Sequence, residues 1–275
     1  MNAFFEIDGE WLYPRPHARS PWSAQMLHGR LLAGLAAAAS EADHGEWDLQ
    51  PTRLTVDLFK NVGMEPVSVQ SKVVRSGRRI KVVDAEVRTS TALVARTTLV
   101  LLRRSDQDGN DLAPSTSTWD APHVSELGPP RSSRDGSRPA ADIWVLDGKQ
   151  AIQAGWGDGW RRAWWRDHHA LVEGQELTPF VRTALAADFA SPLSHFSDAG
   201  LSFINADFSL HLSRDPVGEL IGIEVSGRSS ANGVAVGHCR LYDETGPVGI
   251  CSTSAVANQW RSPTEQTPTT RLSAR

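Results

Sequence analysis

The stretch Trp22–Ala42 (WSAQMLHGRLLAGLAAAASEA) constrains the fold of this chain more than any other part of the sequence. Leu27, Leu31 and Leu35 recur at a spacing of four, and glycine and alanine fill most positions between them. A helix that is apolar on every side is a buried helix. Its small residues allow a larger element, such as a sheet, to pack closely against it. We therefore predict a buried helix over 27–42 with a sheet wrapped around it.

Composition and charge argue against some classes of binding partner and some cellular locations. The chain has 275 residues, enough for one large domain or two small ones. Its net charge of −4 and its pI near 6.1 argue against nucleic acid as the main partner. No basic region followed by an apolar run opens the sequence, and no apolar run is typical of a membrane span. The sequence has two cysteines, Cys239 and Cys251, and neither belongs to a CxxC pair. Such sparing use of cysteine is typical of a reducing compartment, so we expect a cytoplasmic protein.

The residues around the first helix are typical of strands. A short aromatic piece, Gly9–Tyr13, precedes the helix and suits an edge strand. Gly45 is a good C-cap for the helix. Four strand-like runs follow: Arg53–Phe59, Pro66–Ser76, Arg78–Ser90 and Leu93–Arg103. Short strands joined by tight turns predict an antiparallel meander.

The second half of the chain begins with a change of composition. Residues 105–139 are rich in Asp, Gly, Ser and Pro, which predicts a linker too polar to order itself. A second apolar helix is predicted over Thr178–Phe196, with Thr178 as N-cap and Pro179 at the first helical position. Further strand-like runs surround it: Ile143–Val145, Arg161–Val172, Leu201–Leu212, Val217–Ser226, Ser229–Tyr242 and Val248–Ala257. Residues 260–275 predict a disordered tail.

The order of strand, buried helix and four strands occurs twice, in matching register. Asp57 and Asp207 stand 150 positions apart, and the same offset relates the Ser-Gly-Arg sequences at 76–78 and 226–228. We interpret both Ser-Gly-Arg sequences as hairpin turns at equivalent places. Such a repeat favours an internal duplication over two unrelated α+β halves.

Beyond these turns the offset between the repeats grows by four residues. Val94 and Val248 stand 154 positions apart. We attribute the extra residues to a longer hairpin at Asp243–Gly246.

An antiparallel sheet curled around one long buried helix is the hotdog fold, and two of them in one chain resemble the double-hotdog acyl-CoA thioesterase II family. The resemblance is carried by ALAADF (184–189), INADFSLH (204–211), GRSSANGVAVG (227–237), LYDETG (241–246) and ICSTSAVAN (250–258). It implies an α+β tandem hotdog. The implied domains are an N-terminal hotdog at 1–104, the linker at 105–139, a C-terminal hotdog at 140–259 and the tail at 260–275.

The resemblance also implies an activity. It is hydrolysis of fatty acyl-CoA to fatty acid and CoA by direct attack of water, with no cofactor besides the CoA of the substrate. We expect a homo-oligomer, a dimer of double hotdogs. In the family, an aspartate on the second helix, a threonine-like residue on the next strand and a glutamine on the last strand position the water. These places fall on Asp188, Asn205 and Ala255, so the aspartate is kept and the glutamine is lost.

The residues themselves support part of this assignment. Asp188 is the one acid in ALAADFA, where desolvation would raise its pKa and suit it as a general base; the alternative is a helix edge touching solvent. Asn205 could hold the same water, or be a polar residue on a half-exposed strand. Ser252, Thr253 and Ser254 lie beside the missing glutamine. Ser254 is our candidate for its replacement and Thr253 for substrate contact, against plain strand decoration.

His28 and Gly29 open the first buried helix and resemble the His-Gly-Gly entry of many hotdog thioesterases, with Arg30 in place of the second glycine. In those enzymes a backbone amide there faces the thioester oxygen. A helix N-terminus offers free N–H groups and a partial positive charge, and glycine allows close approach. A glycine needed only for packing is the alternative. We predict that His28 and Gly29 bind substrate, opposite Asp188.

Other chemistries fit less well. Asp167, His168 and His169 suggest a metal, but neighbouring strand residues point to opposite faces, so we predict none. GxSxG, a cysteine nucleophile and a glycine-rich phosphate loop are absent from the sequence. A non-catalytic acyl-CoA or acyl-chain binding protein stays an alternative, favoured by the lost glutamine. A hotdog dehydratase would need an Asp/His pair that we do not find.

Overall fold

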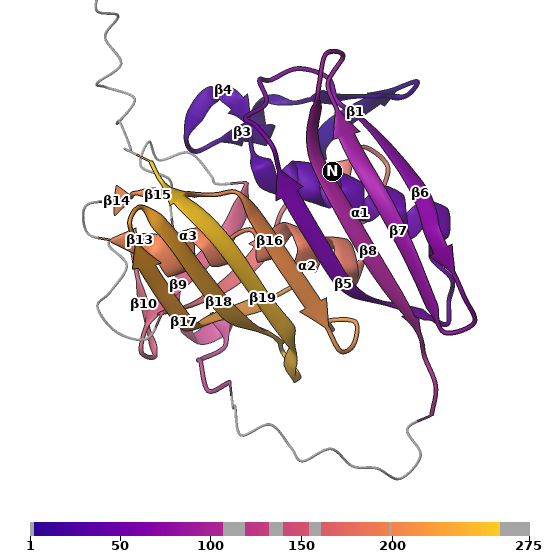
Figure 1. The fold of residues 1–275 in the computed structure, drawn as a ribbon. Coiled ribbons are helices and arrows are strands. Elements are labelled where there is room, and N and C mark those ends of the chain that lie inside the picture. The colour runs from indigo at the N-terminus through magenta and orange to yellow at the C-terminus, as the bar shows by residue number, and fades with distance from the viewer. Residues whose placement is uncertain (1–2, 107–118, 132–139, 154–160, 198–199, 259–275) are drawn as a thin grey trace, which may run out of the picture.

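The computed structural model describes residues 3–106, 119–131, 140–153, 161–197 and 200–258 (Figure 1). The N-terminal half contains helix α1 (Gly29–His44) and the strands β5 (Leu49–Leu58), β6 (Ser68–Ser76), β7 (Ile80–Arg88) and β8 (Leu93–Arg103). Ahead of α1 lie β1 (Ala3–Asp8), β2 (Trp11–Pro14), the 3-10 turn Pro16–Ala18, β3 (Arg19–Ser20) and β4 (Ser23–Leu27).

The C-terminal half contains two helices, α2 (Pro179–Ala187) and α3 (Ala190–His195). Its strands ahead of α2 are β9 (Ala141–Asp147), β10 (Gln150–Ile152), β11 (Arg161–Asp167) and β12 (Ala170–Val172). After α3 come β13 (Phe196–Ser197), β14 (Gly200–Leu201), β15 (Phe203–Asn205), β16 (Asp207–Leu212), β17 (Ile221–Ala231), β18 (Val234–Asp243) and β19 (Gly246–Ala257). A 3-10 turn, Val124–Glu126, lies between the halves in sequence.

One twelve-stranded sheet runs through both halves. Its order is β10-β9-β11-β17-β18-β19-β16-β5-β8-β7-β6, with β15 pairing to β19. The halves meet where β5 pairs with β16, and there Asp57 stands directly opposite Asp207. The ladder register relates the strands of the halves at an offset of 154, because Thr55 pairs with Thr98 as Ser209 pairs with Ser252. Thr55 and Ser209 also pair with each other, so a local two-fold axis passes between them. This arrangement confirms the predicted α+β tandem hotdog.

The order of strands within each half differs from the predicted meander. β5 pairs with β8 and β16 rather than with β6, which follows it in sequence. Only β6, β7 and β8 form a meander, and β17, β18 and β19 repeat it. The first strand of each set is displaced to the middle because it carries the contact between the halves.

The repeated Ser-Gly-Arg sequences are not equivalent turns, which corrects our prediction. The first lies between β6 and β7, but the second lies inside β17, at a bulge between Val225 and Gly227. The β17–β18 turn falls instead on Asn232 and Gly233, whose φ angles are 53° and 79°. Asn-Gly is the pair that adopts positive φ most readily in hairpins.

The helix N-caps His28 and Thr178 stand 150 positions apart, whereas β5 (Leu49–Leu58) and β15–β16 (Phe203–Leu212) already stand 154 apart. The extra residues of the second repeat therefore lie between α2 and β15 and not at Asp243–Gly246.

The first helix matches the prediction closely, beginning and ending two residues later than 27–42. Gly45 is its C-cap, as predicted, and its N–H donates to the Glu41 carbonyl at 2.8 Å. Thr178 caps α2, as predicted, by accepting from the Val181 N–H at 3.1 Å.

The second helix is broken, whereas we predicted one helix over Thr178–Phe196. The break falls at Asp188 and Phe189, between α2 and α3. Its cause is Pro192, which has no N–H to donate to the carbonyl of Asp188 four residues earlier and whose ring would collide with it. The Ser191 N–H donates to that carbonyl instead, at 3.3 Å. The helix thus changes course at its one buried acid.

Several short elements also differ from the prediction. The run predicted over Arg161–Val172 is two strands, and that over Leu201–Leu212 is three. The aromatic piece Gly9–Tyr13 forms a hairpin with β1, which we did not predict, and Gly9 takes a φ of 60° in its turn. β1 also pairs in parallel with β12, so the N-terminal strand is attached to the C-terminal half.

Part of the predicted linker is ordered, which corrects our prediction. Trp119 stacks on Tyr242 at a centroid distance of 4.6 Å and meets the edge of Trp164 at 4.9 Å. The Trp164 indole N–H donates to the Pro122 carbonyl at 2.9 Å. Aromatic burial therefore fixes residues that composition alone marked as polar. The rest of the linker and the tail lie outside the described residues, and the predicted domain boundaries stay predictions.

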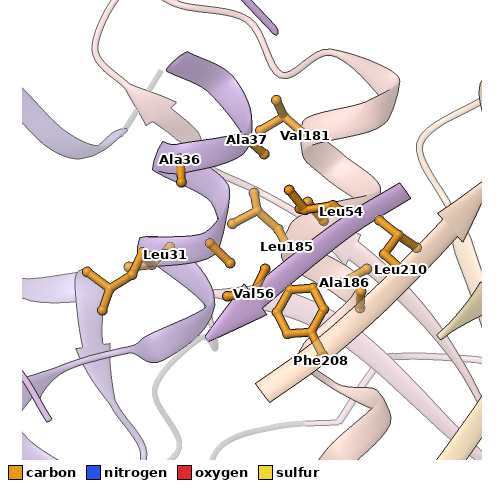
Figure 2. Packing of buried hydrophobic residues seen from close by; sticks show 14 of the residues in the cluster. Leu31, Ala36, Ala37, Leu54, Val56, Val181, Leu185, Ala186, Phe208 and Leu210 are labelled. Carbon is orange, nitrogen blue, oxygen red and sulfur yellow. The ribbon is translucent and has the colours of Figure 1, made fainter. Parts of the chain in front are cut away.

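The hydrophobic core lies between the sheet and the paired helices α1 and α2 (Figure 2). The helices touch at Gly34, where an added Cβ would lie 2.5 Å from Leu185. Further toward the end of α1, Glu41 accepts a hydrogen bond from Thr178, the N-cap of α2. The helices therefore run antiparallel, so the start of α1 lies beside the end of α2.

Candidate active site

Asp188 occupies the break between α2 and α3 and is the centre of the candidate site. Asp188 is 8% exposed. Burial raises the pKa of this carboxyl, while the Asn205 amide and the charge of Arg30 act in the opposite direction. A buried carboxylate with a raised pKa has the properties of a general base.

Asn205 is the immediate partner of Asp188. Its Nδ2 donates to Asp188 Oδ1 at 2.8 Å. Because the amide nitrogen faces a carboxylate, the amide oxygen is left to accept from another group. The structure thus joins two of the predicted residues from different elements.

Alternate side chains of the last strand, β19, point toward this pair and away from it. Ala255 stands directly opposite Asn205 in the ladder, so the two side chains share a face. Cys251 and Thr253 alternate with it onto the same face, and the Cys251 thiol points toward the Ala187 carbonyl at 3.6 Å. Ala255 is 3% exposed. The methyl group at the family's glutamine position therefore faces the Asp188 end of the helices.

Thr253 and Ser254 are placed less favourably than we predicted. The Thr253 hydroxyl donates to the Asp207 carbonyl at 2.9 Å, so it is engaged within the sheet. Ser254 alternates to the opposite face from Ala255, and its N–H donates to the Asp207 side chain at 2.8 Å. The structure does not bring the Ser254 hydroxyl to Asp188, because a shift of one residue along a strand reverses the direction of the side chain.

The start of α1 supplies the opposite side of the site. His28 is the N-cap, and its Nδ1 accepts from the Arg30 N–H at 3.4 Å. His28 is half-buried in the structure. Desolvation of its imidazole and, to a smaller extent, the charge of Arg30 lower the pKa of His28 to about 3. His28 is therefore neutral at physiological pH. With Nδ1 accepting, its proton resides on Nε2, which makes that atom a donor.

Gly29 is the first residue of α1 and has room for a side chain. An added Cβ would meet only Leu58, at 3.4 Å, which is an ordinary contact. The protein itself therefore does not require glycine here. Gly34, in contrast, is required by packing against Leu185.

Sequence reasoning missed a buried ion pair beside the site. Arg30 Nη1 lies 2.6 Å from Asp167 Oδ1, and both side chains are at most 3% exposed. We noted Arg30 only as the residue that replaces a family glycine, and Asp167 only as a metal candidate. A charged residue at the start of an apolar helix was the available signal, but its partner lies 137 positions away.

The suggested metal residues have separate partners. Asp167 binds Arg30, His168 lies 2.8 Å from Asp142, and the His169 ring stacks on His17 at 4.3 Å. Among the described residues, no group of three His, Cys, Asp or Glu side chains could hold a metal ion.

Both cysteines are buried and unpaired. Burial raises the pKa of the Cys239 thiol to about 12 and holds that of Cys251 well above its usual range. No helix in the described parts of the chain is long and apolar enough to cross a bilayer.

Comparison with solved structures shows the same fold in other proteins. The acyl-CoA thioesterase II of Mycobacterium marinum has a TM-score of 0.61 at 13% identity, over 96% of each chain. The tesB protein of Mycobacterium avium subspecies paratuberculosis has a TM-score of 0.64 at 13% identity, over 92% of this chain and 95% of that one. A hotdog-fold protein of unknown function from Alicyclobacillus acidocaldarius has a TM-score of 0.67 at 15% identity, over 94% and 96%.

Comparison with protein families is more specific. The acyl-CoA thioesterase N-terminal domain matches residues 18–102, and the acyl-CoA thioesterase C-terminal domain matches residues 108–257. The sequence matches none of the curated proteins with which it was compared. The two domain matches together span nearly the whole tandem fold, in the order that the repeat predicts. The chain therefore belongs to the double-hotdog acyl-CoA thioesterase family.

Proposed function

We propose that this protein hydrolyses fatty acyl-CoA thioesters to a fatty acid and free CoA. The observation that carries the proposal is the buried Asp188 carboxyl bound to the Asn205 amide beside the N-terminus of α1. A carboxylate base, a second water ligand and a donor for the carbonyl oxygen are the parts that direct hydrolysis needs.

In this proposal Asp188 removes a proton from a water that the Asn205 amide oxygen orients. The water oxygen attacks the thioester carbon, and the carbonyl oxygen takes up negative charge. The Gly29 N–H group, at the positive end of α1, stabilises that charge. The carbon–sulfur bond then breaks, the carboxylic acid forms, and the CoA thiolate takes up a proton. The reaction needs no cofactor besides the CoA of the substrate.

The direct test is the release of CoA thiol from a panel of acyl-CoAs of different chain length, with and without a metal chelator. We expect release by the natural protein, unchanged by the chelator, and its loss in Asp188→Asn. The chain's own matched control is Glu41→Gln. Glu41 is another partly buried acid on the paired helices whose pKa burial raises, but it lies at the opposite end.

Ala255 favours a second candidate, a protein that binds acyl-CoA without hydrolysing it. At the position where the family has a glutamine, a methyl group cannot hold water. Calorimetry with the same acyl-CoA panel distinguishes the two candidates. Binding without thiol release would support the binding protein and contradict the hydrolase.

A further inference from the structure

Arg30 is a charged side chain buried where the two hotdogs meet. It is 2% exposed. Its guanidinium contacts Asp167 Oδ1 at 2.6 Å, and Asp167 Oδ2 accepts from the Trp165 indole N–H at 2.8 Å. Both carboxylate oxygens are thus engaged. The pair joins α1 of the first half to β11 of the second.

Two aromatic rings hold the guanidinium in place. It lies over the ring of Phe4 at 5.0 Å and over that of Trp165 at 5.1 Å. Phe4 belongs to β1, the strand that pairs with the C-terminal half. A guanidinium fixed by a carboxylate and two ring faces has little freedom to move. Its charge is therefore a fixed feature of this junction.

This fixed charge lies next to the candidate active site. Arg30 is the second residue of α1, directly after Gly29. The Trp165 ring packs against Phe189, the neighbour of Asp188, at 5.1 Å. The positive charge of Arg30 lowers the pKa values of both Asp188 and His28. At Asp188 it opposes burial, which is the larger influence.

Stability alone is a poor reason for burying this pair. Removing two charges from water is costly, and apolar side chains of similar size often serve the fold equally well. The chain contains such a comparison, because Phe180 stands 150 positions after Arg30, at the equivalent place in α2. Phe180 is fully buried. The fold thus accepts an apolar residue at this helix position, and only the Asp188 end carries the charge.

We propose that Arg30, held by Asp167 and Trp165, is a positioning residue whose fixed charge stabilises the carboxylate form of Asp188, the form that accepts a proton from water. The inference rests on the proposed hydrolysis. It assigns Arg30 no contact with substrate, because its guanidinium is directed into the ion pair. It also gives a reason why arginine follows Gly29 in this chain.

Other ionisable groups of the described residues also lie at this junction. They are His28 on α1, Asp167 on β11, His169 beside β12, Asp207 on β16 and Cys251 on β19. His28 is neutral above about pH 3, and the Cys251 thiol stays protonated because burial raises its pKa. The pKa of His169 is lowered, first by burial and then by His17. Two changes of the Arg30–Asp167 pair therefore give distinct predictions for the pKa of Asp188.

The test measures the titration midpoint of the Asp188 carboxyl by carbon NMR, assigned by comparison with Asp188→Asn. In the double variant Arg30→Met/Asp167→Asn, which removes both charges, we expect a higher midpoint than in the natural protein. In Asp167→Asn alone, the charge of Arg30 is no longer balanced, so we expect a lower midpoint. Arg30→Lys keeps the charge and should stay near the natural value. The opposite shifts separate an electrostatic role from a change in folding.

Turnover gives a second readout. The acid limb of kcat/KM against pH should move with the midpoint, so that activity below it falls about tenfold for each pH unit of upward shift. The matched control is Arg96→Met/Asp57→Asn, an exposed pair at 3.0 Å, which should move neither quantity. An unmoved midpoint in both Asp167 variants, or an equal loss of activity at every pH, would overturn the inference. Shifted midpoints in a protein that releases no CoA would contradict the hydrolase and leave the charge effect on Asp188 established.

Discussion

The two ends of the α1–α2 pair are equivalent by the repeat but different in chemistry. At one end the start of α1, His28 and Gly29, lies beside the end of α2, where Asp188 is buried. At the other end the start of α2, Thr178 and Pro179, lies beside the later turns of α1.

The repeat allows the ends to be compared residue by residue. Asp188 corresponds to Ala38 at the offset of 150 that relates the two helices. Asn205 corresponds to Pro51 at the offset of 154 that relates the strands, because Pro51 pairs with Leu101 as Asn205 pairs with Ala255. The second end has no carboxylate at the position of the proposed base. The two junctions are therefore similar in fold, and the residues that we propose for hydrolysis stand at the Asp188 end.

The second end also has a cavity, which lies beside no equivalent of Asp188. It has a volume of ≈ 310 Å³ and is lined by Glu41, Leu101, Arg104, Pro179 and Asp215 among others. Its Arg104 already contacts Asp215 at 2.5 Å. Open space alone therefore does not make a catalytic site. The comparison can be tested by changing one end at a time.

The largest expected effect is that of Asp188→Asn. The amide keeps the shape and the hydrogen bond from Asn205 but cannot take up a proton, so kcat should fall on the order of 10²-fold or more. Glu41→Gln, at the other end, should leave kcat unchanged. CoA release under saturating substrate measures both. Equal turnover in Asp188→Asn and the natural protein would show that the chemistry does not depend on this end.

The next effect is that of a methyl group at Gly29. Gly29→Ala should lower kcat/KM about 10-fold to 100-fold, because the substrate can no longer approach the start of α1. Its melting temperature should stay close to the natural value, because the added carbon makes an ordinary contact with Leu58. The control is Gly34→Ala, which should destabilise by ~1–3 kcal/mol through its collision with Leu185. Normal kcat/KM in Gly29→Ala would mean that substrate does not bind there.

A smaller effect is expected from restoring the missing amide. Ala255→Gln should raise kcat by up to about tenfold, because Ala255 stands opposite Asn205 and a longer amide could help to orient the water. The equivalent position in the first half is Leu101, and Leu101→Gln should give no gain. Thiol release and melting temperature are measured together. If Ala255→Gln instead melts lower by the equivalent of ~1–3 kcal/mol with no gain, the site is filled and holds its water in another way.

The smallest effect concerns stability and pH. Burial raises the folded pKa of Asp188 above its unfolded value, so the folded protein binds this proton more tightly. That stability is fully present below the unfolded pKa of about 3.9 and is lost as the pH rises through the folded pKa. Asp188→Asn should therefore melt at a higher temperature than the natural protein at pH 7, and the advantage should vanish near pH 3. Thermal melts across this range measure it, and an advantage that grows toward low pH would contradict the assignment.

Local pattern alone determined the main elements of this protein. The alanine-rich run with leucine at every fourth position can only be buried, and its length requires a helix. Alternation and turn residues predicted both ends of β8 correctly, and they predicted the ends of the other long strands within a few residues. The internal repeat predicted two similar halves, and these halves pair through β5 and β16, although their strands are related by 154 positions and not by 150. Asp188 stood out because an acid among apolar neighbours must either reach solvent or have a role.

Tertiary structure decided what depends on distant partners. No local pattern joins Asn205 to Asp188, or reveals that Ser254 points away while Ala255 points inward, because both follow from the register of β15 and β19. The Arg30–Asp167 pair links residues far apart in sequence, across the contact between the halves. Charges interact through space, so the environment of Asp188 is set by whichever elements the fold brings beside it. Sequence named Asp188 as the candidate base, and only the packing of the two hotdogs set its electrostatic surroundings.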